Sequence, residues 1–160
     1  MDTYKINIEG LDRELRKFPV NDKLDIAAFI MFGDIEMTEV AARELLKRVP
    51  EHDVVVTAEA KGIPLCYEMA RQGCRNYVVA RKSVKVYMDN PIEYKETSIT
   101  TQKEQSLFLG HEDGDLLTGK KVLIVDDVIS TGESLKAVQG LVKAFKGNIV
   151  ASCAPLAEGD

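Results

Sequence analysis

The residues best suited to binding chemistry form one short run, Asp126-Asp127 followed by the hydroxyl- and glycine-rich residues 130–134. They follow residues 122–125, an apolar stretch typical of a buried parallel strand, so both carboxylates should stand at the strand end where open α/β sheets bind ligands. The next turn should open a helix, whose first N–H groups and dipole favour a phosphate dianion. Two carboxylates beside it suit a vicinal diol or a hydrated divalent cation. The run predicts a ribose 5-phosphate site, against the plainer alternative of a solvated turn and helix cap.

The elements that must position this run alternate between strands and helices. Apolar, largely β-branched stretches predict strands at 53–57, 77–80, 122–125 and 149–151. Helical spacing of apolar residues predicts three helices, one before the first of these strands and two between strands, which end near Pro50, Gly73 and Gly147. This alternation predicts an α/β fold with a doubly wound, mostly parallel sheet and helices on both faces.

The N-terminal segment has a weaker pattern. Residues 4–8 alternate between apolar and polar side chains and predict a short strand. The apolar run 24–33 is compatible with either a buried strand or a short helix, since periodicity cannot separate the two. Asp34 or Thr38 should cap the first helix, which follows this run.

Composition excludes several functional classes. With 160 residues, of which 45% are apolar, the chain has the size of a single domain, residues 1–160. A net charge of −5 and the absence of Trp argue against nucleic-acid and anionic-membrane partners. No apolar run reaches the length of a membrane span and no signal-peptide pattern opens the chain, so we expect a cytoplasmic protein. Cys66, Cys74 and Cys153, an odd number without CxxC spacing, should be reduced thiols.

One long polar segment, residues 82–106, interrupts the alternation. Such an insertion in a compact domain is typical of a flexible functional lid, although a plain surface loop is the alternative. The strand-prone residues 97–101 also allow a short antiparallel hairpin there. Residues 71–103 carry seven cationic side chains and three carboxylates, a basic stretch that suits a polyphosphate substrate.

The run from Val122 to Ser134 resembles the phosphoribosyl pyrophosphate (PRPP) motif of type I phosphoribosyltransferases. The resemblance implies that Asp126 and Asp127 bind the ribose 2′- and 3′-hydroxyls. It also implies a loop for the 5′-phosphate formed by Ser130, Thr131, Gly132, Glu133 and Ser134. The Glu133 side chain should turn away from that phosphate.

Two further segments extend the resemblance. Thr57-Ala58-Glu59-Ala60-Lys61-Gly62 resembles the pyrophosphate loop of the family, which implies pyrophosphate contacts from Glu59, Ala60, Lys61 and Gly62. Lys61 stands where members resembling adenine phosphoribosyltransferase often have Arg, so the charge is kept without the guanidinium fork. Ala80-Arg81-Lys82-Ser83-Val84-Lys85 resembles the Arg-Lys-x-x-Lys segment, which implies pyrophosphate contacts from Arg81, Lys82 and Lys85, with catalytic roles for Arg81 and Lys85.

Two shorter matches concern the base. Ile92-Glu93-Tyr94 resembles the Leu-Glu-Tyr catalytic lid of adenine phosphoribosyltransferase, which implies that Glu93 manages a purine proton and that Tyr94 is catalytic; the alternative is that both are surface residues. Phe32-Gly33-Asp34-Ile35 resembles the Phe-Arg-Asp-Ile segment near the base pocket, with Gly33 in place of Arg. We therefore expect residues 1–35 to contribute to the base pocket, with base contacts from Phe32 and Val128.

These matches imply a purine-type phosphoribosyltransferase of purine salvage, in which a nucleobase and PRPP give a nucleoside 5′-monophosphate and pyrophosphate. Mg²⁺ is the implied cofactor, held by Asp126 and Asp127 directly or through water, and a homodimer is the implied assembly. The alternative is a non-catalytic regulator that senses PRPP or a nucleotide on the same fold.

Overall fold

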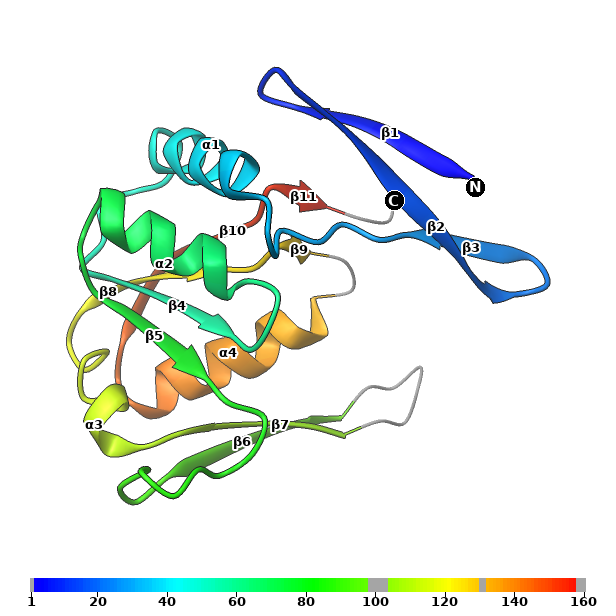
Figure 1. The fold of residues 1–160 in the computed structure, drawn as a ribbon. Coiled ribbons are helices and arrows are strands. Elements are labelled where there is room, and N and C mark those ends of the chain that lie inside the picture. Colours follow the sequence, from blue (N-terminus) through cyan, green and yellow to red (C-terminus); the bar gives the residue numbers. More distant parts are fainter. Residues whose placement is uncertain (1, 98–103, 130–131, 158–160) are drawn as a thin grey trace.

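The computed structural model describes residues 2–97, 104–129 and 132–157 (Figure 1). Its centre is a parallel sheet of four strands in the order β10-β8-β4-β5. Their bounds are β4 (Val54–Ala58), β5 (Tyr77–Ala80), β8 (Lys121–Val125) and β10 (Asn148–Cys153). The predicted parallel α/β fold is thus confirmed. From β4 the chain continues to β5 on one side and then returns to β8 on the other side of β4, so the strand order reverses between β4 and β8.

Helices cover both faces of this sheet (Figure 1). One face packs against α1 (Ile35–Leu46) and α2 (Ile63–Gln72), and the other packs against α4 (Glu133–Ala144). The alternation along β4 shows why its apolar run is unbroken: Val54 and Val56 enter the cluster under α4, whereas Val55 enters the cluster under α1 and α2.

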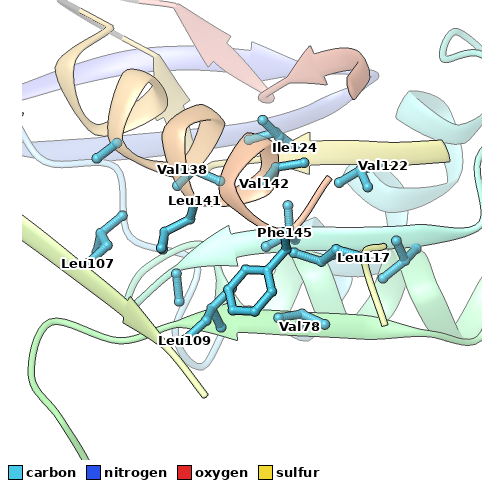
Figure 2. Close-up of a cluster of buried hydrophobic side chains, with 14 residues drawn as sticks. Val78, Leu107, Leu109, Leu117, Val122, Ile124, Val138, Leu141, Val142 and Phe145 are labelled. Atoms are coloured by element: carbon cyan, nitrogen blue, oxygen red, sulfur yellow. The ribbon is translucent and has the colours of Figure 1, made fainter. Parts of the chain in front are cut away.

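The core beneath α4 aligns that helix with the sheet. Figure 2 shows Leu141, Val142 and Phe145 directed toward β8 and the neighbouring strands, where they meet buried Val122 and Ile124. Because these side chains are at most 5% exposed, the second half of α4 is held firmly against the sheet.

The N-terminal residues form a separate antiparallel sheet of β1 (Thr3–Ile8), β2 (Leu11–Asn21) and β3 (Leu24–Ala27), in that order. The strand expected at 4–8 is confirmed, whereas only the first residues of the run 24–33 are strand and the rest is not helical. Arg13 of β2 pairs with Asp34, with Nε 2.7 Å from Oδ2. Asp34 also accepts a bond from Met37 N at 3.1 Å, which makes it the cap of α1.

The polar insertion contains a paired hairpin, whereas residues 98–101 of the strand-prone stretch 97–101 lie outside the described part of the chain. Strands β6 (Ile92–Thr97) and β7 (Glu104–Leu109) are antiparallel, and the hairpin packs against α4. The residues between them lie outside the described part of the chain. A short helix α3 (His111–Gly114) follows, and β9 (Val128–Ile129) pairs with β11 (Leu156–Ala157). None of the described helices is long and apolar enough to cross a membrane.

Candidate active site

A cavity of about 520 Å³ opens at the carboxyl ends of β4 and β8, where the winding of the sheet reverses. This is the place at which open α/β sheets bind their ligands. Its lining residues are Ala58, Glu59, Ala60, Lys61, Lys82, Gln105, Ser106, Leu107, Asp126, Asp127, Val128 and Ser134. The cavity thus joins residues from the strand ends, the hairpin and the first turn of α4.

The acidic pair forms the floor of this cavity. Asp127 is 5% exposed, and its Oδ2 has no hydrogen-bond partner among the described residues. Asp126 is half-buried, and its Oδ1 accepts a bond of 2.8 Å from Asp127 N. Burial, followed by the hydrogen bond to Asp127, raises the pKa of Asp126 to about 7. A buried carboxylate oxygen without a hydrogen-bond partner costs free energy. A ligand hydroxyl or a cation bound to this pair would remove that cost.

The loop after β4 passes close to the acidic pair. A Cβ at Gly62 would lie 2.5 Å from Thr57 Oγ1 and 3.4 Å from Asp126 Oδ1, so glycine permits this approach. Lys61, one residue earlier, lines the cavity, and its charge acts on Asp126 by lowering the pKa of that carboxyl. The loop therefore presents a cation beside two carboxylates.

Arg81 and Lys82 occupy different positions although they are adjacent. Lys82 lines the cavity, and its backbone N donates to Glu59 Oε1 at 2.6 Å. Arg81 instead pairs with Glu59, with Nε 3.3 Å from Oε2, and donates to the Tyr87 hydroxyl. Lys85 is near enough for its charge to contribute to lowering the pKa of Glu59, but it is not among the described lining residues.

The turn before α4 has the features of an anion site. Gly132 precedes the helix with a φ of +82°, a conformation that favours glycine. A small cavity of about 40 Å³ is lined by Asp126, Val128, Ile129, Gly132, Glu133, Ser134 and Leu135. The helix N-terminus supplies backbone donors to this space. Ser130 and Thr131, which were assigned to the same loop, lie outside the described residues.

The hairpin separates the two residues expected to be catalytic in the lid. Glu93 accepts a bond of 3.0 Å from Ser106 Oγ, which places it beside the cavity rather than among its lining residues. Tyr94 packs into the core instead: its ring lies against Gly140 of α4, where a Cβ would collide with it. Adjacent residues of a strand face opposite sides, so one motif yields one residue near the cavity and one in the core.

Sequence reasoning missed Ala58 at the end of β4 and three lining residues of the hairpin, namely Gln105, Ser106 and Leu107. Gln105 also links the hairpin to α4, since Ser134 Oγ donates to its Oε1 at 3.4 Å. The three hairpin residues belong to β7, which begins within the polar insertion 82–106 and continues beyond it. The short apolar run Leu107-Phe108-Leu109 was the available signal for this strand.

The N-terminal segment stands apart from the described lining of the cavity. Phe32 is 52% exposed, and none of the described residues 2–35 lines the cavity, so the structure does not bring the expected base-pocket segment to it. Val128 does line the cavity. Within the described ranges, no group of three or more His, Cys, Asp or Glu side chains gathers as a metal site.

Comparisons with known proteins agree with this geometry. The family model of the phosphoribosyl transferase domain matches residues 31–160. Over 156 residues the chain is 31% identical to the adenine phosphoribosyltransferase of Thermotoga maritima. The match covers 92% of this chain and 83% of that protein. Over 159 residues it is 30% identical to the hypoxanthine/guanine phosphoribosyltransferase of Methanococcus voltae, covering 94% and 81% respectively.

A solved structure shows the same fold. The adenine phosphoribosyltransferase of Saccharomyces cerevisiae, crystallised with an imino-altritol bisphosphate and adenine, matches with a TM-score of 0.75 and 19% identity. The match covers 90% of this chain and 84% of that one.

Proposed function

The chain belongs to the phosphoribosyl transferase family, and on that premise we propose that it is a purine phosphoribosyltransferase. In this reaction a ring nitrogen of the base forms a bond to C1 of PRPP, and the bond from C1 to the pyrophosphate oxygen breaks. The products are a nucleoside 5′-monophosphate and pyrophosphate. The observation that carries the proposal is the buried Oδ2 of Asp127, which has no hydrogen-bond partner among the described residues and lies in a cavity lined also by Lys61 and by Ser134 of the first turn of α4.

Each part of the cavity has a role in this proposal. Asp126 and Asp127 accept hydrogen bonds from the ribose hydroxyls, and the backbone N–H groups at the start of α4 hold the 5′-phosphate. Binding at this distant phosphate orients C1 toward the base. Lys61 and Lys82 line the same cavity and stabilise the negative charge that develops as pyrophosphate leaves.

Mg²⁺ is part of the proposal, because two adjacent carboxylates suit a cation that completes its shell with water and phosphate oxygens. Asp126 and Asp127 would hold it, directly or through water. When bound, the cation neutralises phosphate charge. The remaining positive charge at the site comes from the lysines of the chain itself.

Fewer contacts support the residues proposed to bind the nucleobase. Glu93 stands beside the cavity through its bond with Ser106 and is proposed to accept or return a purine ring proton. Val128 contributes an apolar contact for the base. The similarity to adenine and hypoxanthine/guanine enzymes supports a purine, and a reaction that consumes a free purine belongs to purine salvage.

The proposal is tested by incubating the protein with Mg²⁺, PRPP and, in separate reactions, adenine, hypoxanthine, guanine, xanthine or orotate. We expect pyrophosphate and the matching nucleoside monophosphate with at least one purine, and neither product with the Asp126→Asn/Asp127→Asn variant. Transfer to orotate alone would overturn the purine assignment. PRPP binding without transfer to any base would favour a ligand-sensing regulator instead.

A further inference from the structure

A carboxylate occupies the loop proposed to receive pyrophosphate. Glu59 lines the large cavity close to Lys61 in the chain. Pyrophosphate carries several negative charges, so a carboxylate facing it would be repelled and would weaken binding. We therefore expect the charge of Glu59 to be offset by neighbouring donors and cations.

Both oxygens of Glu59 have partners on the segment that follows β5. Oε1 accepts a bond of 2.6 Å from Lys82 N, and Oε2 lies 3.3 Å from Arg81 Nε. The backbone bond from Lys82 and then the charge of Arg81 lower the pKa of Glu59, so the side chain is ionised at neutral pH. Its charge is thus offset by the segment that follows β5.

Arg81 is fixed from further directions. Its guanidinium donates to the Tyr87 hydroxyl. Its backbone exchanges two hydrogen bonds with Phe108 of β7, of 3.0 Å and 2.8 Å. The Glu59–Arg81 pair therefore connects the loop after β4 with the same strand that supplies Gln105 and Ser106 to the cavity.

We propose that Glu59 is a positioning residue, which holds Arg81 and the Lys82 backbone so that the Lys82 side chain is presented to pyrophosphate. The inference rests on the proposed function, since it concerns the same leaving-group site. It assigns Arg81 an indirect role: the guanidinium braces the loop through Glu59, and the Lys82 ammonium meets the ligand.

The inference is tested by whether Glu59→Gln strengthens or weakens the binding of magnesium pyrophosphate. Glu59→Gln keeps the size of the side chain and an acceptor for Lys82 N, but it removes the charge that holds Arg81. Simple electrostatics predicts tighter binding of magnesium pyrophosphate once a negative charge is lost. Positioning predicts the opposite, a loss of about tenfold in affinity, equivalent to about 1.4 kcal/mol. Calorimetric titration of the parent and the variant gives the answer.

Two companion variants make the result specific. Glu68→Gln removes a buried carboxylate that pairs with Arg71 on α2, and it should keep the parental affinity for magnesium pyrophosphate. Arg81→Gln should weaken binding in the parent but add little in the Glu59→Gln background, because the two residues act as a unit.

Affinity in Glu59→Gln that equals or exceeds that of the parent overturns the inference, as do fully additive losses in the double variant. A lower melting temperature with unchanged affinity also overturns it, since the pair would then be structural alone. A parent that binds neither magnesium pyrophosphate nor PRPP overturns the proposed function and the inference with it.

Discussion

Replacing Asp126 with asparagine should stabilise the ligand-free protein at neutral pH, even though it removes a proposed ribose ligand. Burial, followed by the hydrogen bond to Asp127, raises the pKa of Asp126 from 3.8 to about 7. Below about pH 4 the group is protonated in both the folded and the unfolded chain, and it imposes no penalty. As pH rises toward 7 the unfolded chain releases the proton while the folded chain retains it, so the free energy of unfolding falls.

The size of this fall in the free energy of unfolding follows from the raised pKa of Asp126. Each tenfold change in ionisation constant corresponds to about 1.4 kcal/mol, which gives about 4 kcal/mol for a fully enclosed group. Asp126 is partly exposed, and screening by solvent reduces the expected penalty to about 2 kcal/mol. For a chain of this length that corresponds to about 4–8 °C in melting temperature.

The assay is chemical or thermal unfolding of the parent and Asp126→Asn between pH 4 and pH 8, in buffer with a chelator and without PRPP. We expect a gain in stability for the variant above pH 7 that shrinks toward zero near pH 4. Asp22→Asn, at an exposed turn between β2 and β3, is the control and should show no comparable gain. A variant less stable than the parent at pH 7.5, or a gain that does not vary with pH, would refute the reasoning.

Three other substitutions have definite expected outcomes. Gly132→Val forces a β-branched residue to a φ of +82° and should weaken ribose 5-phosphate binding by calorimetry; equal affinity in mutant and parent would remove Gly132 from the phosphate site. Glu93→Gln should leave PRPP affinity near normal and lower the turnover number by about 10²–10⁴-fold in a pyrophosphate-release assay; parental turnover would make Glu93 a surface residue. Gly140→Ala places a Cβ against the Tyr94 ring and should cost about 1–3 kcal/mol in urea unfolding; an unchanged midpoint would contradict the packing of Tyr94 on α4.

The central sheet was predictable because its strands are buried on both faces. Val54, Val55 and Val56 are all fully buried, so the run is apolar without interruption and reads as a strand in sequence. By contrast, β2 contains runs of charged residues with few apolar ones, and Leu15 is its one residue in the buried core of the described chain. The strand conformation of β2 depends on its pairing with β1 and β3. That pairing is not visible in the local sequence pattern.

The presence of Asp126 and Asp127 at the cavity could be predicted because one segment supplies both the residue types and their spacing. The site was less predictable where partners come from distant segments. The charge of Arg81 is visible in the sequence, but its pairing with Glu59 depends on the contact between two loops of the folded sheet. Likewise, the opposite directions of Glu93 and Tyr94 depend on the strand that contains them, and that strand lay within a polar insertion.

Calorimetric binding of PRPP, with Mg²⁺ present, to the parent and to Asp126→Asn/Asp127→Asn tests most directly whether the acidic pair and the turn before α4 form a PRPP site. We expect the parent to bind PRPP and the double variant to lose at least about tenfold in affinity, since each charged hydrogen bond contributes about 1.5–3 kcal/mol. The variant should remain folded by circular dichroism. Equal PRPP affinity in a folded double variant would contradict the placement of the ribose on Asp126 and Asp127.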